Sequence, residues 1–435
     1  MVEVWLPYGK TEVCVRIPTR NLGAVIEPRE KEGALNPQAE IENALMNPIG
    51  TRRLAEATKP GDKVTVVLKD SGTSTNRIIV SAILKELATA NVKEGDITII
   101  AAYDPLRTSP PPSAEPFLSD DLSSKVTVLR HDCGTSECVG VGRTSRGTDV
   151  YLNKRFLEAG LKVLAGVVEP HPFAGYSGGR EGVLPGVSGM ETIQQSLSLS
   201  LNPKAERGSF EGNPVHDDMM EAARLAKVDF TLDIVRNQRL EVVRAFAGDL
   251  NEAFGESVRL AEDIYKVPVE GRADVVFISP GGYPFDIDLL EASKGIDGAV
   301  AATKRGKVVV LVAECMNGCG KRDFREALSR FKDPGALERS LKKRFSIGAF
   351  MAYRMLTALQ RTRMILVSVM PEYLVPEALE VKMARTANEA VDYAFDIVGK
   401  NGKISAIPYG NLTTLSIGAP EQGETGKEIN LPESS

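Results

Sequence analysis

A continuous apolar run, Leu161 to Val168, and the loop that follows it to Gly186 constrain this chain more than any other stretch. A run of this length without polar alternation predicts a strand buried on both faces of a parallel sheet. The loop contains five glycines and three prolines, which is typical of backbone that approaches a ligand closely. His171 follows the strand's carboxyl end, where open α/β sheets bind ligands. We interpret it as a ligand-binding residue or general base; the alternative is a histidine that only bonds backbone.

An earlier segment of the chain predicts a second unit of the same kind. Lys63 to Lys69 is a β-branched run typical of a central parallel strand. The polar turn Asp70 to Thr75 can cap the helix predicted over Asn76 to Ala90, and Ile97 to Ala102 is the next strand. The aspartate of the turn and the segment Tyr103 to Arg107 therefore lie at adjacent strand ends, where we expect a ligand.

The length of the chain argues for two domains, because a single core stops growing near about 250–300 residues and this chain has 435. A new strand–helix–strand unit starts at Ala273, and its turn, Pro280 to Pro284, precedes a helix predicted over Asp286 to Thr303. The predicted fold class is α/β, with two α/β domains whose mostly parallel sheets surround a central cleft. The predicted ranges are 1–268 for the N-terminal domain, 272–400 for the C-terminal domain, 401–420 for a final strand that could return to the first domain, and 421–435 for a disordered tail.

Charge and hydropathy exclude some classes of partner. The chain has 53 basic and 58 acidic residues, a net charge of −5, and the two signs are interspersed rather than gathered into the basic face of a nucleic-acid-binding protein. No apolar stretch approaches the ~18 residues of a membrane span, and the N-terminus lacks the basic flank of a signal peptide. We therefore expect no nucleic-acid or membrane partner and a cytoplasmic location.

The five cysteines offer a separate hypothesis. Four of them form two close pairs, Cys133 with Cys138 and Cys315 with Cys319. If the pairs converged across the cleft, they could form a four-ligand metal site, although the spacing is looser than in zinc motifs. Ordinary buried thiols or one short disulfide are the alternatives.

Six short motifs stand out along the chain: Asn47 to Gly50, Glu169 to Arg180, Leu184 to Gly186, Ala247 to Asp249, Gly281 to Asp286 and Ala292 to Gly295. Together they resemble the lactate racemase family over roughly Met1 to Leu415. The resemblance implies two α/β domains around a cleft and a nickel-pincer cofactor derived from a pyridinium nucleotide. In that family the cofactor accepts a hydride from a 2-hydroxy acid, while two histidines exchange protons with the acid.

The resemblance assigns roles at some positions and departs from the family at others. His171 keeps the family's proton-transferring histidine and is our candidate metal ligand, and Lys294 keeps the lysine of the second domain. Glu181 stands where the family has the lysine that tethers the cofactor, and a carboxylate cannot form that link. Leu197 and Leu106 stand where the family has the nickel-ligand histidine and the second proton-transferring histidine.

Substrate binding is implied for a further set of residues. Asp70 keeps the family's aspartate, Thr73 falls on the substrate-binding arginine, and Arg77, one helical turn further, could substitute for it. Glu291 replaces a glutamine on the second-domain helix. The remaining expected binding residues are Arg107, Tyr176, Ser177, Gly178, Gly179, Arg180 and Tyr283.

Three functions are compatible with these residues. The first is an isomerase, a racemase or epimerase of a small 2-hydroxy acid or related carboxylate, working by proton or hydride transfer, with His171 as one base and Glu181 or Lys294 as the other. The replaced positions argue against lactate racemisation in its ordinary form and against a tethered nickel-pincer nucleotide, which leaves that cofactor in untethered form or a related nucleotide as the alternatives. The second is a binding or regulatory protein that kept the cleft without turnover. The third is the cysteine-ligated metal protein.

Overall fold

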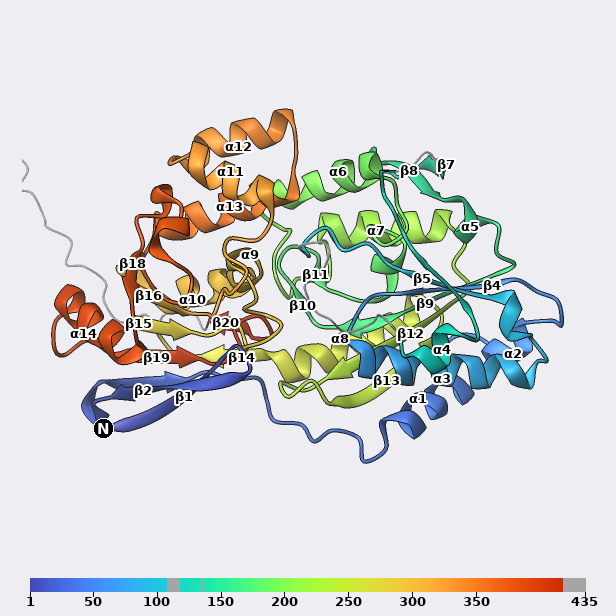
Figure 1. Cartoon of the computed structure of the whole chain (residues 1–435), viewed down its shortest axis with the longest axis horizontal. Coiled ribbons are helices and arrows are strands. Elements are labelled where there is room, and N and C mark those ends of the chain that lie inside the picture. The colour runs from blue at the N-terminus through green and yellow to red at the C-terminus, as the bar shows by residue number, and fades with distance from the viewer. Residues whose placement is uncertain (108–117, 135–136, 418–435) are drawn as a thin grey trace, which may run out of the picture.

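The computed structural model describes residues 1–107, 118–134 and 137–417. It contains two six-stranded sheets, one in each half of the molecule (Figure 1). The predicted α/β class with mostly parallel sheets is confirmed. The predicted tail at 421–435 lies outside the described residues, as do positions 418–420 of the predicted final strand. Within the described part of the chain, no helix is both long enough and apolar enough to cross a membrane.

The first sheet has the strand order β13-β12-β9-β4-β5-β6, and only the edge pair β12–β13 is antiparallel. Its two central strands, β4 and β9, are formed by the two apolar runs identified in the sequence. The strands are β4 (Val64–Leu68), β5 (Ile97–Ala101), β6 (Thr127–Arg130), β9 (Leu161–Val168), β12 (Phe230–Arg236) and β13 (Val242–Gly248).

Alternation along β4 explains why this sheet is covered on both faces. Val64, Val66 and Leu68 join the core formed with α1 (Pro37–Met46), α2 (Leu54–Ala57) and α3 (Thr73–Thr89), whereas Val67 faces the opposite core. That opposite core contains α6 (Met190–Ser198) and α7 (Pro214–Leu225). The long helix α8 (Glu252–Tyr265) packs against β12 and β13. Both faces are thus closed to solvent, which leaves the strand ends for a ligand.

The second sheet is parallel throughout, with the order β18-β17-β16-β15-β19-β3. Its strands are β15 (Ala273–Ile278), β16 (Thr303–Val312), β17 (Arg363–Val367), β18 (Lys382–Ala384) and β19 (Ile404–Ile407), with β3 (Leu22–Val25) at one edge. Helices α10 (Ile296–Ala302), α11 (Arg322–Arg330), α12 (Pro334–Lys343), α13 (Ile347–Leu359) and α14 (Ala387–Val398) complete this half.

The start of the chain lies with the second half, whereas the sequence places it in the first domain at 1–268: β3 is an edge strand of the second sheet, and the hairpin before it packs against that sheet. The hairpin β1 (Val2–Tyr8) and β2 (Thr11–Ile17) buries the inward side chains of both strands against β15, β16 and α14. Two isolated strands are marginal in water, so the hairpin needs an apolar surface, and the second sheet supplies it. At the junction of the halves, β14 (Lys266–Val269) pairs with β20 (Thr414–Ile417).

The helix predicted over Asp286 to Thr303 is interrupted. It forms α9 (Leu289–Ala292), a 3-10 turn at Ser293–Gly295, and α10. A Cβ at Gly295 would lie 2.4 Å from the carbonyl oxygen of Gly410, so the helix passes very close to the chain after β19 there. The interruption places Lys294 at the boundary between the two halves.

Candidate active site

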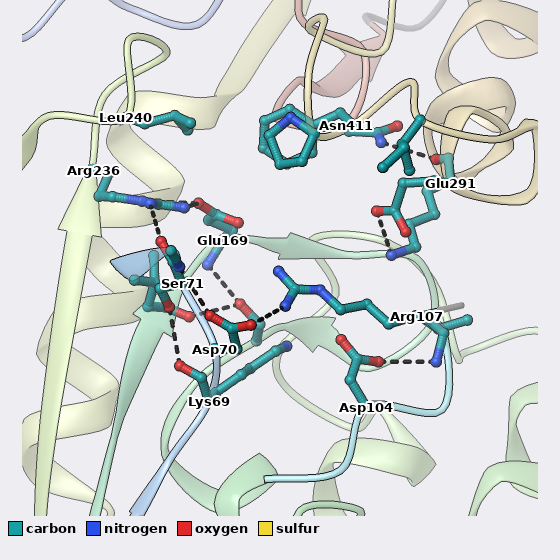
Figure 2. A pocket seen from close by; sticks show the side chains of 18 of the residues that line it. Lys69, Asp70, Ser71, Asp104, Arg107, Glu169, Arg236, Leu240, Glu291 and Asn411 are labelled. Atoms are coloured by element: carbon teal, nitrogen blue, oxygen red, sulfur yellow. Dashed lines mark hydrogen bonds and ion pairs between the residues drawn. The ribbon is translucent and has the colours of Figure 1, made fainter. Parts of the chain in front are cut away.

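A cavity of about 520 Å³ lies between the two halves of the molecule. Its first-domain wall is formed by the segments that follow β4, β5, β9 and β12, as the strand-end argument predicts. Its second-domain wall consists of Tyr283 to Lys294 with Asn317 and Asn411. Figure 2 shows how the charged side chains of the two walls point into it. The charged residues that line it are Lys69, Asp70, Asp104, Arg107, Glu169, Arg207, Arg236, Arg239, Asp288, Glu291 and Lys294.

His171 occupies the first-domain wall and is 9% exposed. It ends β10 (Pro170–His171), which pairs with β11 (Gly175–Tyr176) in a tight hairpin. Burial lowers the pKa of His171 to about 3, so the ring is neutral near pH 7. Its Nδ1 accepts the backbone N–H of Ala174 at 3.0 Å and that of Phe173 at 3.4 Å. The proton of the neutral ring therefore resides on Nε2, which lies 3.4 Å from Glu181 Oε1, a separation at which this N–H can be shared with a ligand oxygen.

Glu181 lies behind His171 rather than in the cavity. Its Oε1 is 3.4 Å from His171 Nε2, and its Oε2 is 2.7 Å from Lys69 Nζ. Burial alone would raise the pKa of Glu181, but Lys69 and then His171 hold it below its usual range. Glu181 borders a small void of about 20 Å³ that it shares with Lys69, His171 and Leu197. A ligand in the main cavity thus meets Lys69 and His171 first.

Asp70, Asp104 and Arg107 form a second charged group, at the ends of β4 and β5 (Figure 2). Arg107 Nη1 lies 2.8 Å from Asp70 Oδ2, and Asp104 accepts the backbone N–H of Leu106 at 2.9 Å. Burial alone would raise the pKa of Asp104, but Lys69 and two further cations hold it well below its usual range. At the end of β12, Arg236 pairs with Glu169 at 2.5 Å.

The second-domain wall presents another ion pair. Lys294 Nζ lies 2.6 Å from Glu291 Oε1, and burial raises the pKa of Glu291 in spite of Lys294. Arg207 ties this wall to the first domain, because its guanidinium donates to the carbonyl oxygens of Lys294 at 2.6 Å, Asn411 at 2.8 Å and Pro170 at 3.4 Å. The walls are therefore joined by hydrogen bonds as well as by packing.

The structure brings most of the predicted site residues to this cavity. Those that line it are Asp70, Thr73, Arg107, His171, Ser177, Tyr283, Glu291 and Lys294. Arg77 is elsewhere: it is exposed on α3, and its Nη2 lies 3.6 Å from Asp121 Oδ2. It therefore does not substitute for the arginine that Thr73 replaces. The cavity instead offers the guanidinium groups of Arg107, Arg207, Arg236 and Arg239.

The glycine-rich part of the loop supports the site from within the core. Arg180 is fully buried and donates to the carbonyl oxygens of Ala174, Tyr176 and Gly178, with its guanidinium over the Phe254 ring. Gly179 donates its N–H to buried Asp233 at 2.7 Å. Of the residues between Tyr176 and Arg180 that were predicted to bind substrate, Ser177 alone lines the cavity in the described part of the chain. The other four stabilise the conformation of the loop and do not contact the cavity.

Sequence reasoning missed several charged side chains of the site, namely Lys69, Asp104, Glu169, Arg207, Arg236, Arg239 and Asp288. Lys69 had a signal because it is adjacent to Asp70 at the end of a predicted strand, and Asp104 had one because it lies in the segment Tyr103 to Arg107 that follows the next strand. Glu169 and Arg236 required knowledge that β9 and β12 are neighbours. Arg207 lies in a segment without a recognisable pattern, and its role depends on two chain segments that meet only in the folded molecule.

The residues present do not fit a tethered nickel-pincer cofactor. Glu181 is engaged by Lys69 at the tether position, and Leu197, 1% exposed, is part of the apolar core at the nickel-ligand position. Leu106 lines the cavity as an apolar side chain. Among the residues that the structure describes, no three His, Cys, Asp or Glu side chains converge as metal ligands, the cysteine pairs included.

Family models and curated relatives that match nearly the whole chain all belong to lactate racemases. Residues 8–208 match the family model described as the lactate racemase N-terminal domain, and residues 269–413 match the lactate racemase C-terminal domain. A lactate racemase of Thermoanaerobacterium thermosaccharolyticum is 29% identical over 420 residues, covering 94% of this chain and 98% of that protein. A lactate racemase of Lactiplantibacillus plantarum is 28% identical over 427 residues, with 94% and 99% covered.

Two solved structures share the architecture. The lactate racemase apoprotein from T. thermosaccharolyticum superposes with a TM-score of 0.86 at 28% identity, covering 95% of this chain and 100% of that one. A protein from Thermotoga maritima superposes with a TM-score of 0.64 at 16% identity, with 89% and 100% covered. The second likeness concerns the fold alone.

Proposed function

The chain belongs to the lactate racemase family, and from that premise we propose that it is an isomerase of the racemase or epimerase type. Its ligand is a small 2-hydroxy acid or a related carboxylate that binds between the two domains. The observation that carries the proposal is the cavity itself, which gathers His171, Lys69 and Arg107 on one wall and Lys294 on the other. Enclosed cavities with a few convergent polar groups are the usual form of small-molecule sites.

Carboxylate binding follows from the cations of the two walls. Lys294 is our choice for the carboxylate contact, with Arg107 as the second donor. Each of them already has an acidic partner, Glu291 and Asp70 respectively. A ligand carboxylate would therefore share each cation with the acidic side chain that already pairs with it. The carboxylate is bound less tightly than it would be by an unpaired cation. His171 keeps its Nε2 proton and shares it as a hydrogen bond between Glu181 Oε1, 3.4 Å away, and an oxygen at the reacting carbon.

The proposed reaction proceeds without the family's tethered cofactor, because the residues at the tether and nickel-ligand positions are Glu181 and Leu197. The nickel-pincer group would supply a hydride acceptor, and we derive no step through it. This part of the proposal is tested on protein purified after co-expression with the cofactor-making enzymes. Stoichiometric nickel or a covalent adduct detected by mass spectrometry would refute it.

The isomerase proposal is tested with single enantiomers of a panel of 2-hydroxy acids and related carboxylates, among them 2-oxo acids with a stereocentre beside the ketone. The full chain is incubated with each compound in D₂O, and chiral chromatography and NMR follow inversion and deuterium uptake. We expect at least one compound to invert, and His171→Gln to slow inversion by at least about 100-fold. The control is Glu262→Gln, since Glu262 on α8 is half-exposed, pairs with Lys266 at the start of β14, and does not line the cavity.

A ligand-binding protein without turnover is the second candidate, and the replaced residues Glu181 and Leu197 favour it. It predicts that the same compounds stabilise the fold in thermal unfolding without inversion or deuterium uptake. Any measured inversion rules it out.

A further inference from the structure

Inversion at carbon requires a proton acceptor on one face of the substrate and a proton donor on the other. On the first-domain wall, the ammonium group of Lys69 stands at the junction of the main cavity and the small void. The Lys69 side chain is 27% exposed, whereas that of its partner Glu181 is 5% exposed. Lys69 is therefore the member of this pair that a ligand contacts, and Glu181 positions it.

His171 is not the proton acceptor of this wall. Its Nδ1 already accepts the backbone N–H groups of Ala174 and Phe173, so its Nε2 carries the ring proton. Removal of that proton would create an imidazolate, and protonation of Nδ1 would break the contacts that hold the ring. His171 is suited to donate a hydrogen bond to an oxygen that becomes negative, in the manner of an oxyanion-stabilising group.

On the opposite wall, Glu291 is the carboxylate best placed to accept a proton. It lines the cavity from α9, and its side chain remains 15% exposed beside Lys294. Asp288 also lines this wall, but it caps α9 by accepting the N–H of Glu291 at 2.8 Å. Burial raises the pKa of Glu291, which makes it a stronger base than an ordinary carboxylate. In Figure 2, Lys69 and Glu291 enter the pocket from different sides.

We infer that Glu291 and Lys69 are the proton-transferring pair of this site, and that the carbon they invert is adjacent to a ketone or aldehyde carbonyl. The inference rests on the proposed function and names residues and a substrate class for it. The Glu291 carboxylate takes the hydrogen, and the C–H electron pair becomes the C=C bond of an enolate whose oxygen is bound by His171. The Lys69 ammonium then protonates the other face, the C=C pair forms the new C–H bond, and the carbonyl is restored.

The substrate class follows from two properties of the site: it does not accommodate a hydride acceptor, and it presents cations. A 2-hydroxy acid without a neighbouring ketone has no easy carbanion route and is inverted through a hydride acceptor, which Glu181 and Leu197 do not accommodate. A hydrogen adjacent to a ketone leaves as a proton, so the step consumes no oxidant or reductant. The nearby Lys294 and Arg107 favour a carboxylate in the same molecule. A 2-oxo acid with a stereocentre at C3 meets all these conditions.

The probe is therefore (S)-3-methyl-2-oxopentanoate, whose C3 hydrogen is adjacent to the ketone. NMR in D₂O measures loss of the C3 proton, and chiral chromatography measures inversion, each against the reaction without protein. We expect the full chain to accelerate both. Glu291→Gln keeps the shape and the contact with Lys294, so it should lower kcat by at least about 100-fold and change KM by less than about 3-fold. Glu262→Gln is the matched control.

Lys69 is tested in a background that avoids a buried, unpaired carboxylate. Lys69→Met combined with Glu181→Gln is compared with Glu181→Gln alone, and the additional loss of kcat should again reach about 100-fold. Unchanged kcat in either comparison overturns the assignment of that residue. Inversion of a 2-hydroxy acid without any reaction of the 2-oxo acid overturns this inference and leaves the proposed function standing. No reaction with either compound class overturns both.

Discussion

The ion pair between Lys69 and Glu181 provides the sharpest test of how the site is built. Lys69→Met removes the cation that lies 2.7 Å from Glu181. The carboxylate then keeps only the backbone N–H of Gly178 at 3.3 Å and the contact with His171 at 3.4 Å. Breaking a buried pair by removal of one partner costs about 3–5 kcal/mol of the free energy of unfolding. Because Lys69 is 27% exposed and water reaches it, we expect the lower end, about 3 kcal/mol.

The reverse change and the double change complete a thermodynamic cycle. Glu181→Gln leaves Lys69 without its carboxylate but partly hydrated, which should cost about 1–2 kcal/mol. The double variant Lys69→Met with Glu181→Gln has no buried charge, so its total loss should also be about 1–2 kcal/mol. The two single losses sum to about 4–5 kcal/mol, and the coupling free energy is therefore about 3 kcal/mol.

Urea unfolding followed by circular dichroism at neutral pH measures all four proteins. The result that refutes the reasoning is additivity, with the double variant losing the sum of the two single variants to within about 0.5 kcal/mol. A second measurement uses pH. Since the pKa of Glu181 is lowered in the folded state, its stabilising effect is present above the unfolded value of about 4.3 and is lost as the pH falls through the folded value. The wild-type advantage over Glu181→Gln should therefore disappear only in acid.

Three further changes probe the surroundings of the site. Because the folded pKa of His171 is about 3, against about 6.5 unfolded, the stability of the wild type relative to His171→Gln should fall by about 2 kcal/mol between about pH 7.5 and about pH 5; a constant difference in urea midpoints would contradict a neutral ring. Gly175→Ala should cost more than about 3 kcal/mol, because its Cβ would lie 2.0 Å from the Ser209 carbonyl oxygen at a φ of +77°. Gly212→Ala, at a φ of +71° with open space around it, should cost only about 1–2 kcal/mol, and equal losses by urea unfolding would disprove the steric reason. Arg207→Met should speed amide hydrogen exchange around Lys294 and Asn411 by at least about 10-fold, and unchanged exchange there would show that the two walls do not depend on this side chain.

The strand ends were predictable because period and punctuation are local properties of the chain. The β-branched run before Asp70 and the apolar run before the loop of His171 both became central strands, β4 and β9. Parallel strands bring their carboxyl ends to one edge, so Asp70, Arg107 and His171 could be expected at one cavity. Glu291 and Lys294 were reached differently, through the resemblance of the second-domain motifs to the lactate racemase family.

The role of an individual charged side chain depends on the residues that it contacts in the folded molecule. Glu181 reads as a cavity residue in the sequence, but in the fold it stands behind His171 and holds Lys69. Arg77 is one helical turn from Thr73, yet the direction of α3 turns it toward Asp121 and away from the cavity. Neither position could be predicted from the spacing of residues along the chain, because each depends on which face of a helix or loop packs against the neighbouring segments.

The sequence by itself determined the α/β class, the mostly parallel sheets, and the loop that carries His171, because these depend on hydrophobic periodicity and on glycine and proline. Only the tertiary structure decided that the N-terminal hairpin packs against the second sheet, that Arg207 joins the two walls, and that Lys69 and Glu291 face the cavity. The reason is physical: ion pairs and domain contacts act through space between residues that lie far apart in the chain, 112 positions in the case of Lys69 and Glu181.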